Sequence, residues 1–500
     1  MPQETTRNDI SRCEISVKDV LVQSVKFLTL DSFFIGISST RIYCRPICRA
    51  RQAKEENCTF YHSAAEAEQA GYRPCLLCRP EIAPGSSITD TTEMLVHRAC
   101  RMLEENCSKG ESIEELARRL GCTGRHLRRV FKAEYNVSPM QYLRTCRLLL
   151  AKNLLTDTNL SVLDIAMSAG FGSLRRFNDI FKNHYQLSPT ALRKRVSEEK
   201  KQSKDITLSL GYRPPYRFEE ILEFLSARAI PGIELIKNHE YMRTVCLQNT
   251  NKKYVTGWVR VSNATKKNAL SVTFCENLLP VLPQLLAKVR QLFDLYCDPE
   301  TIYETLTQMN DIRSSLCVLG TRLPGCFNAF EMAVRAVLGQ QISIKAASTL
   351  AGRFVEAFGT PLDTDIPGLT HTFPLPKELL ALDKPIENHL GPLGIIATRA
   401  RTIYSLAEAF EQGNIDFELP AYPEEEIKKL LAIPGIGNWT AQYIAMRTME
   451  WTDAFLETDL GIKKALEPHK VKEILEMAEA WRPWRSYATI NLWNSLQYRK

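Results

Sequence analysis

Four cysteines in two close pairs constrain the N-terminal part of this chain more than any other feature. Three residues separate Cys44 from Cys48, two separate Cys75 from Cys78, and 26 residues lie between the pairs. Two short loops that each offer two thiolates are a common way to bind one tetrahedral zinc ion. We therefore expect a small domain over residues 1–88 that binds one Zn²⁺ through Cys44, Cys48, Cys75 and Cys78.

Arginines surround these cysteines and leave two interpretations of the metal site open. They are Arg41, Arg45, Arg49, Arg51, Arg73 and Arg79. Guanidinium groups favour phosphate, and a zinc-bound thiolate remains a nucleophile, which together indicate a reactive site beside a phosphate group. The alternative is a closed, inert zinc site that only holds together a domain too small for a core.

The net charge of +7 is concentrated in one segment of the 500-residue chain, which is too long for a single hydrophobic core. Residues 91–200 contain 19 Lys and Arg against 12 Asp and Glu, an excess of 7, and the remaining residues contain 45 against 45. This placement indicates a partner with a phosphate backbone, and a solvated basic helix face is the alternative.

The expected location follows from what the chain lacks. No apolar run reaches the length of a membrane span, and the first residues are polar without an apolar signal segment. We expect an intracellular protein without a membrane partner, cytoplasmic and nucleoid-associated if its source is bacterial. The fifteen cysteines are then expected to be free or metal-bound.

The basic segment contains an internal repeat at an offset of fifty residues. Phe131-Lys132 recurs as Phe181-Lys182, and Ser138-Pro139 recurs as Ser188-Pro189. Each copy has the pattern of a short helix, a turn containing glycine and an Arg-rich second helix, which predicts two helix-turn-helix units over residues 93–196. The predicted second helices run from about Thr123 to Lys132 and from about Ser173 to Lys182. These helices carry side chains that can contact base edges or phosphates, among them Arg125, Arg128, Arg175 and Arg176. A single copy is equally typical of a plain helical hairpin, but the duplication favours DNA binding.

The rest of the chain changes from strands to helices. Residues 206–280 contain alternating stretches (RTVCLQ, YVTGWVRVS, ALSVTF) that predict an antiparallel sheet, and residues 281–500 are mostly helical. Within the helical part, Pro434-Gly435-Ile436-Gly437 separates a helix ending near Ala432 from one starting near Trp439. Gly435 and Gly437 permit a tight turn whose backbone N–H groups, with the next helix N-terminus, can hold a DNA phosphate.

Asp459 stands 22 residues beyond this hairpin, after the apolar residues Ala454-Phe455-Leu456. The pairing of the hairpin with a downstream aspartate resembles the helix-hairpin-helix glycosylase superfamily, and the resemblance implies that this carboxylate stabilises a developing sugar cation and orients water during loss of a damaged base. For a single aspartate, capping a helix is the structural alternative. We expect Asp459 to be the catalytic residue.

The N-terminal segments resemble two known families. RIYCRPICRARQAKEENCTFYHSAAEAEQAGYRPCLLCRP resembles the zinc domain of the Ada methylation-response proteins, and the repeat resembles the AraC-type activators. The first resemblance implies that Cys44 accepts a methyl group irreversibly from DNA methylphosphotriesters and thereby activates sequence-specific DNA binding, with Arg45 among the phosphate contacts. The second implies promoter DNA and RNA polymerase as partners.

The C-terminal part resembles the AlkA-type alkylpurine glycosylases of the helix-hairpin-helix superfamily. The similarity covers YRPPYRFEEILEFLSARAIPGIE, FEMAVRAVLGQQIS and AWRPWRSYATINLW. It implies a base pocket built from Trp439, Tyr443 and Trp493, although each aromatic ring is equally suited to a core. It also implies DNA contacts at Gln341, Gly435, Gly437 and Thr440, and a monovalent cation at the hairpin. Gln341 departs from the family pattern, since some AlkA-type enzymes have at this position a leucine that they insert into the base stack.

Two chemical expectations follow from this resemblance. Superfamily members that cut the strand carry a lysine just after the hairpin, where this chain has Trp439, so we expect no strand cleavage. No cysteine follows Cys326, which excludes the iron–sulfur type.

The combined expectation is a multidomain α+β protein. It consists of a zinc methyl-acceptor domain (1–88), a helical double helix-turn-helix domain (93–196), an antiparallel-sheet subdomain (206–280) and a helical helix-hairpin-helix glycosylase domain (281–500). We expect a monofunctional glycosylase that excises 3-methyladenine and 7-methylguanine from double-stranded, alkylated DNA. The alternative is a regulator whose inactive glycosylase half only grips DNA. The Pro-Cys-His-Arg stretch of O6-methylguanine methyltransferases is absent, so we expect no repair of that base.

Overall fold

The computed structural model describes residues 33–46, 48, 50, 53–80, 94–107, 111–196, 205–383, 385–418, 420 and 422–497. The chain divides into two compact units, Met1–Pro80 and Glu81–Lys500. Among the described residues, no helix combines the length and the apolar character needed to cross a bilayer.

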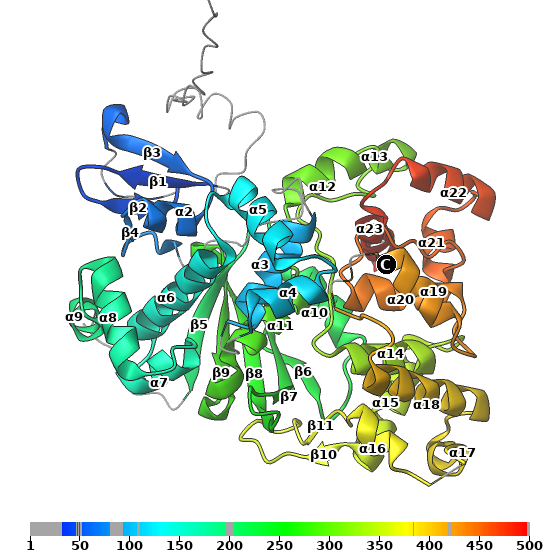
Figure 1. The fold of residues 1–500 in the computed structure, drawn as a ribbon. Helices are drawn as coiled ribbons and strands as arrows, with labels where there is room; N and C mark the ends of the chain where they lie inside the picture. The colour runs from blue at the N-terminus through cyan, green and yellow to red at the C-terminus, as the bar shows by residue number, and fades with distance from the viewer. Residues whose placement is uncertain are drawn as a thin grey trace, which may run out of the picture. The chain divides into compact units, whose positions relative to one another are not determined.

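The described part of the first unit consists of a four-stranded sheet and a short helix (Figure 1). Its strands lie in the order β3 (Cys58–Tyr61), β1 (Phe34–Ile37), β2 (Ile42–Cys44) and β4 (Arg73–Pro74), preceded at β3 by the 3₁₀ turn η1 (Glu55–Asn57). Helix α2 (Ala64–Gln69) starts at Ser63, whose side chain accepts the Glu66 N–H as an N-cap. Among the residues of this unit that the structure describes, the buried apolar cluster has Tyr43, Ala67 and Tyr72 at its centre. So small a core needs further support, which a metal ion can provide.

The repeat predicted from the sequence is present in the backbone of the second unit. Helix α5 (Gly124–Tyr135) is capped by Thr123, and helix α8 (Leu174–Tyr185) is capped by Ser173. Each ends in a left-handed residue, Asn136 or Gln186, at the same offset of fifty. Both helices therefore begin where predicted and continue for almost one further turn. The other helices of this part are α3 (Met94–Glu105), α4 (Ile113–Arg119), α6 (Pro139–Asp157), α7 (Val162–Ser168) and α9 (Pro189–Val196).

The two repeated helices divide their faces between core and solvent. Leu127, Phe131, Phe177 and Phe181 are fully buried. The four arginines expected to contact DNA are exposed on the same two helices: Arg125, Arg128, Arg175 and Arg176. Arg128 forms an exposed 2.5 Å ion pair with Glu114 of α4, a pair that solvent screens and that DNA phosphates can displace.

A five-stranded antiparallel sheet follows, in the order β5-β9-β8-β7-β6. The three predicted stretches form β7 (Glu240–Gln248), β8 (Tyr254–Ala264) and β9 (Ala269–Phe274). The sheet is completed by β5 (Ile206–Gly211) and β6 (Glu234–Lys237), and helix α10 (Phe218–Ser226) connects these two strands. The 3₁₀ segments η3 (Thr265–Lys267) and η4 (Glu276–Val281) precede and follow β9.

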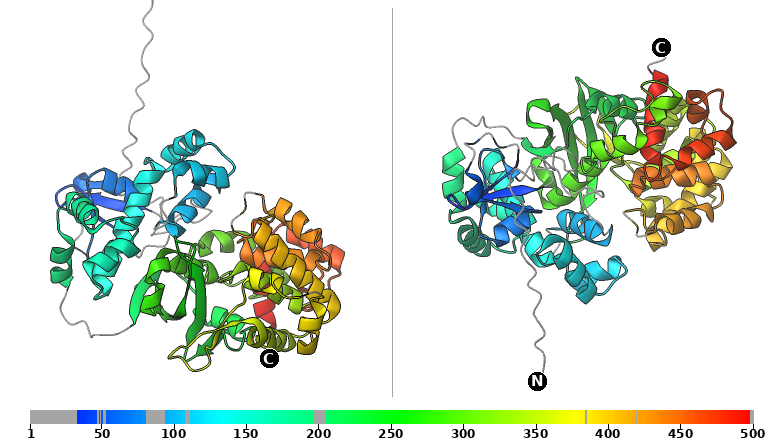
Figure 2. Two further views of the ribbon diagram at one scale, coloured as in Figure 1. Left: turned by 60° about the horizontal axis from the view of Figure 1, so that its bottom comes forward. Right: turned by 90° about the horizontal axis from the view of Figure 1, so that it is seen from above.

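The remaining helices form a bundle beside this sheet, as the views in Figures 1 and 2 show. They are α11 (Leu282–Leu292), α12 (Pro299–Leu306), α13 (Met309–Ile312), α14 (Ala329–Leu338), α15 (Ile344–Phe358), α16 (Pro376–Leu380), α17 (Glu387–Leu390), α18 (Ala397–Gln412), α19 (Pro423–Leu431), α20 (Asn438–Thr448), α21 (Leu460–Ala465), α22 (Val471–Glu479) and α23 (Arg485–Gln497). A two-stranded pair, β10 (Thr360–Pro361) and β11 (His371–Thr372), and the turn η5 (Gly391–Leu393) lie between them in sequence.

Buried ion pairs join the five-stranded sheet to helix α14. Arg243 of β7 donates to Glu331 at 2.7 Å, and Arg335 donates to Glu234 of β6 at 2.9 Å. Because Arg335 also pairs with Glu331 at 3.1 Å, the four charges form one network. Each buried charge is compensated, so removal of one member would leave its partner unpaired in the core.

Polar contacts also connect α3 of the helix-turn-helix part to the bundle. Arg101 forms a 2.5 Å ion pair with Glu450, and its guanidinium lies 3.6 Å from the centre of the Tyr296 ring. Glu104 accepts the hydroxyl protons of Tyr142 and Tyr296, each at 2.8 Å. These two parts therefore belong to one packed unit.

Candidate active site and metal centre

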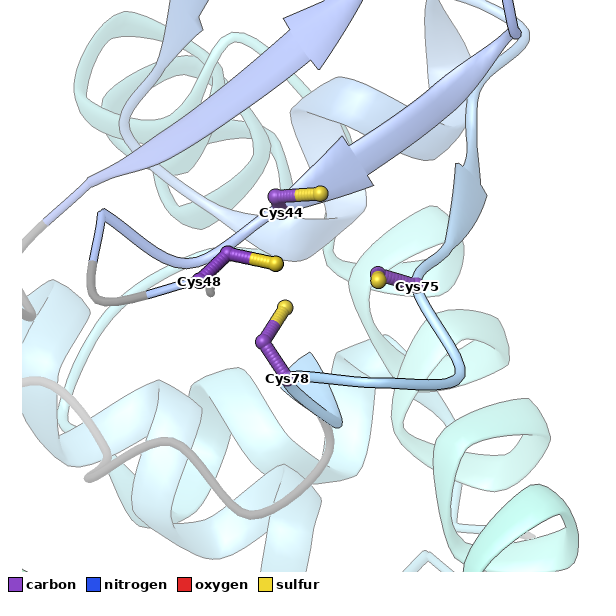
Figure 3. Close-up of side chains that lie close together, drawn as sticks. All are labelled: Cys44, Cys48, Cys75 and Cys78. Atoms are coloured by element: carbon purple, nitrogen blue, oxygen red, sulfur yellow. The ribbon is translucent and has the colours of Figure 1, made fainter. Parts of the chain in front are cut away.

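The four cysteines converge on one point of the first unit (Figure 3). Cys44 ends β2 and Cys48 follows it, whereas Cys75 and Cys78 lie in the loop after β4. Their Sγ atoms all lie within 4.8 Å of one another. Four sulfurs at a Zn–S distance of about 2.3 Å stand roughly 3.8 Å apart in a tetrahedron, so this set fits one zinc ion.

The four sulfurs have different surroundings. The amide of Arg45 donates to Sγ of Cys78 at 3.3 Å, and the amide of Leu77 donates to Sγ of Cys75 at 3.4 Å. Among the described residues, no backbone amide donates to Sγ of Cys44. Contacts with Cys75 and Cys78, together with burial, raise the pKa of the Cys44 thiol. A bound cation is what would allow all four groups to be thiolates at once.

The arginines around the cysteines are only partly described. Arg45 is buried, with 3% of its surface exposed. Arg41 lies with its guanidinium 5.6 Å from the centre of the Tyr72 ring. Arg49 and Arg51 fall outside the described residues.

The glycine hairpin lies between α19 and α20, as predicted. Gly435 has a φ of +90°, and a Cβ atom there would lie 2.1 Å from Oγ1 of Thr402, so only glycine fits. Thr402 holds the turn by donating to the carbonyl of Pro434 at 2.8 Å. Gly437 is exposed and precedes α20, and a Cβ atom there would meet no atom within 4 Å.

A glutamine side chain fixes the other side of the hairpin. Nε2 of Gln340 donates to the Gly435 carbonyl at 2.9 Å and to Oγ1 of Thr440 at 3.0 Å. Thr440 itself is buried. The next residue, Gln341, is exposed between α14 and α15 and has a left-handed backbone with φ of 56°. The loop that presents Gln341 is thus bonded directly to the hairpin.

Asp459 lies in the segment between α20 and α21 with both carboxylate oxygens occupied. Oδ1 accepts from the indole Nε1 of Trp493 at 2.9 Å, and Oδ2 accepts from Nε1 of Trp439 at 3.1 Å. Oδ1 also accepts from the backbone N–H of Ile462 at 3.0 Å, so Asp459 is the N-cap of α21. The capping interpretation is therefore correct, and it coexists with a carboxylate held between two aromatic side chains.

The three predicted pocket residues lie together around this carboxylate. The rings of Trp439 and Tyr443 are stacked at 5.1 Å, and Tyr443 meets Trp493 edge-on at 6.3 Å. Trp439 and Trp493 are half-buried, and Tyr443 is buried. Phe224, from α10, stacks on Trp493 at 6.2 Å and is an aromatic member of the cluster that the sequence did not single out.

Two further residues support this geometry and were missed from the sequence. At Gly461 a Cβ atom would lie 2.9 Å from both Asp459 Oδ1 and the Trp493 ring, so glycine lets the indole reach the carboxylate. Arg485, at the start of the helix that carries Trp493, forms 2.7 and 2.9 Å bonds with the carboxylate of Asp453. No local pattern marks these residues, because their partners are 30 or so positions away along the chain.

The fold and these sites define a class: a modular protein with a four-cysteine metal domain, a duplicated helix-turn-helix domain and a helix-hairpin-helix repair domain. Family models match in the same order. They are the metal binding domain of Ada (22–81), a helix-turn-helix domain (116–195), the AlkA N-terminal domain (207–328) and the HhH-GPD superfamily of base excision DNA repair proteins (334–483).

The comparison with curated proteins identifies the family. The probable bifunctional transcriptional activator/DNA repair enzyme AlkA of Mycobacterium tuberculosis is 34% identical, with 98% of this chain and 97% of the relative aligned. DNA-3-methyladenine glycosylase 2 of Escherichia coli is 35% identical over 57% of this chain and 96% of its own length. The Ada protein of Escherichia coli is 38% identical over 23% of this chain and 31% of its own length. The chain belongs to the family of bifunctional transcriptional activators and alkylation DNA repair enzymes of the AlkA type, and the resemblances and α+β fold class predicted from the sequence are confirmed.

Proposed function

We propose that the second unit hydrolyses the bond between deoxyribose C1′ and alkylated purines such as 3-methyladenine and 7-methylguanine, with Asp459 as the catalytic carboxylate. The observation that carries this proposal is the hydrogen bonding of both Asp459 oxygens to the indole N–H groups of Trp493 and Trp439. A carboxylate held in this way cannot rotate away from the sugar, so it stabilises the developing cation and orients water without reorganisation.

The aromatic cluster suits the leaving group. A purine alkylated at N3 or N7 is cationic and leaves without prior protonation. Rings of the kind formed by Trp439, Tyr443 and Trp493 bind such electron-poor bases through stacking and cation–π contact once the base is rotated out of the duplex. Trp439 occupies the place of the strand-cutting lysine, so the reaction stops at base release.

The hairpin and its neighbouring loop would hold the DNA. The exposed Gly437, with open space at its Cβ position, lets a backbone phosphate approach the N-terminus of α20. Gly435 and Thr440 act by shaping this turn, and a monovalent cation held at the hairpin would supply positive charge that attracts phosphate. Gln341, exposed on the adjoining loop, is placed to enter the space that the rotated base leaves.

The deciding experiment is base release from alkylated duplex DNA by the full-length protein and by Asp459→Asn. The asparagine Oδ1 can still cap α21, so folding and DNA binding should be nearly unchanged. Loss of the charge should slow release about 100-fold or more, or roughly 3 kcal/mol. Undiminished release by the variant would contradict the role of Asp459. No release by the wild-type protein would instead favour a regulator that only grips DNA.

In the first unit, we propose that Cys44 accepts a methyl group from DNA methylphosphotriesters. Its sulfur attacks the methyl carbon, the C–O bond breaks and the phosphodiester leaves with the electron pair, so each molecule reacts once. Bound zinc would keep this sulfur a thiolate without a general base. Cys75 and Cys78 accept amide N–H groups, which weakens their sulfurs as nucleophiles, and no described amide does this at Cys44.

Methylation of Cys44 would then act as a switch for DNA binding. Four thiolates around Zn²⁺ carry a formal charge of −2, and methylation makes Cys44 a neutral thioether and the charge −1. Removing one negative charge from this site lowers its repulsion of a DNA phosphate, by a few kcal/mol at most at a dielectric of ~20. Arg45, expected from the sequence to contact phosphate, is buried with 3% of its surface exposed, so it is not placed as a direct phosphate contact. Arg125, Arg128, Arg175 and Arg176 would supply promoter recognition, with RNA polymerase as the eventual partner.

The switch is tested by promoter affinity at fixed salt before and after exposure to methylphosphotriester DNA. Affinity should rise tens-fold in the wild-type protein and stay constant in Cys44→Ser and in a truncation that lacks residues 1–85. If mass spectrometry shows methylated Cys44 while affinity is unchanged, the domain repairs DNA without acting as a switch.

A further inference from the structure

The hydroxyl group of Tyr443 has an unusual set of neighbours. Its oxygen accepts a hydrogen bond from Nη1 of Arg447 at 2.8 Å, one turn further along α20. A second guanidinium, that of Arg228, interacts with the same hydroxyl and lies 3.8 Å from the centre of the Phe224 ring. A guanidinium group only donates hydrogen bonds, so neither neighbour can accept the Tyr443 proton.

Arg447 is held firmly in this orientation. Its Nε donates to the Pro324 carbonyl at 2.6 Å, and its Nη2 donates to the Gly325 carbonyl at 2.8 Å. The side chain is buried, with 3% of its surface exposed. Nη1 is therefore directed at Tyr443 by two backbone anchors and cannot turn to another partner.

The Tyr443 proton is left to be donated elsewhere. The hydroxyl is buried, and in the part of the chain that the structure describes it donates to no protein acceptor. Burial alone would raise the pKa of Tyr443, but the positive charges of Arg447 and Arg228 outweigh it and lower the pKa, which strengthens the group as a donor. A buried donor of this kind is satisfied when a ligand brings an acceptor.

We infer that Tyr443 donates a hydrogen bond to an acceptor atom on the edge of the rotated base, and that Arg447 is the positioning residue that directs this proton. The inference rests on the proposed function, because it assumes that the base lies against the cluster around Asp459. It adds a polar specificity contact to a site otherwise made of aromatic faces.

The bond becomes stronger as the reaction proceeds. Water attacks C1′, its proton passes to Asp459, and the electron pair of the breaking C1′–N bond leaves with the base. Electron density therefore rises on ring nitrogens and carbonyl oxygens, and a donor aimed at one of them binds the transition state better than the ground state. The gain is larger for a neutral base, which leaves as an anion and takes its proton from solvent, than for a cationic base, which leaves neutral.

The test compares Tyr443→Phe with the full-length wild-type protein on two duplexes, one containing 7-methylguanine and the other hypoxanthine. Phenylalanine keeps the ring stacked on Trp439 and removes only the hydroxyl. Release of the neutral base should fall about tenfold to a hundredfold, the effect of losing a hydrogen bond to a charged acceptor. Release of the cationic base should fall clearly less than release of the neutral base, and thermal unfolding of the two proteins reports whether the variant is folded.

Arg447→Lys tests the positioning role separately. Lysine keeps the positive charge, but its three N–H donors share one nitrogen, whereas Nε, Nη1 and Nη2 of Arg447 each reach a different acceptor. A lysine therefore cannot hold both carbonyl groups and direct a donor at Tyr443 in the same geometry. It should reproduce the selective loss on the neutral base, and the double variant with Tyr443→Phe should lose no more. A further loss in the double variant would overturn the positioning role.

Two other results would overturn the donor role. One is an equal loss of release rate on both duplexes in Tyr443→Phe, which would mean that the tyrosine contributes only its aromatic ring to the site. The other is a wild-type protein that releases 7-methylguanine but no hypoxanthine. A wild-type protein that releases neither base would overturn the proposed function together with this inference.

Discussion

The indole Nε1 of Trp493, on α23, lies 2.9 Å from Oδ1 of Asp459, the residue that caps α21. A half-buried carboxylate that accepts an N–H bond is fixed in direction. The same ring also forms part of the aromatic cluster, so its stacking and hydrogen-bonding roles can be separated by substitution.

Trp493→Phe should lower the rate of base release about tenfold to a hundredfold with a small change in KM. The ring survives, but one charge-assisted hydrogen bond to Asp459 is lost, which costs roughly 1.5–3 kcal/mol. Single-turnover release from 7-methylguanine duplex measures the effect. Trp481→Phe is the matched control, because Trp481 is fully buried against Phe455. It should cost stability and leave the rate of the folded protein unchanged, and equal rate losses in the two variants would contradict the role of the Trp493 N–H.

Gly461→Ala should lower activity although alanine is the better helix former by roughly 1 kcal/mol. The added Cβ atom would stand 2.9 Å from both Asp459 Oδ1 and the Trp493 ring and push them apart. The double variant with Trp493→Phe should be little worse than Gly461→Ala alone, because both changes break the same contact. Additive losses in that cycle would mean that Gly461 acts through something else.

Zinc should co-purify at one ion per chain and disappear when residues 1–85 are removed. The expectation follows from the four Sγ atoms within 4.8 Å of one another in a unit with so small a core. Metal analysis by atomic emission gives the stoichiometry, and Cys75→Ser should also lose the ion and unfold the domain. Zinc retained by the truncated protein would place the metal site in the second unit.

As pH rises, the Asp294→Asn variant should lose less stability than the wild-type protein. Burial raises the pKa of Asp294 to about 6 from its ordinary value near 3.8, so the folded state holds this proton between about pH 4 and pH 6 while the unfolded state releases it. Stability from this group is thus full below pH 4 and lost as pH rises through 6, by roughly 3 kcal/mol.

Asparagine suits this position well. It cannot ionise, its oxygen can accept from Leu323 N–H and the Tyr487 hydroxyl as Oδ2 does now, and it tolerates the local φ of 50°. The variant should unfold like the wild type at pH 4 and at a higher denaturant concentration at pH 8. Parallel stability curves for the two proteins would show that Asp294 does not carry this pH dependence.

The sequence predicted best what is encoded locally. The starts of α5 and α8 were predicted at about Thr123 and Ser173, and these two residues are the N-caps of the helices. The ends were predicted too early, because Asn136 and Gln186 are not obvious stop signals until their left-handed backbone is seen.

The supporting partners of the site could not be predicted, because they come from distant parts of the chain. Gln340 reaches the hairpin from 95 residues away, and Glu331 meets Arg243 across 88 residues. Arg447 binds carbonyl groups more than 120 residues earlier. Only the packed fold brings such pairs together, and a single sequence contains no pattern at that range.

Asp459 is both the proposed catalytic group and the N-cap of α21, with three N–H donors on one carboxylate. In many enzymes an active-site charge destabilises the folded state, and mutations that remove the charge raise the free energy of unfolding. Here the aspartate serves the helix as well, so selection for folding alone is enough to retain it over evolution. An aspartate at this position in a related chain is therefore weak evidence of activity. In a related chain that has become inactive, Trp439 or Trp493 should be replaced first, while the capping aspartate is kept.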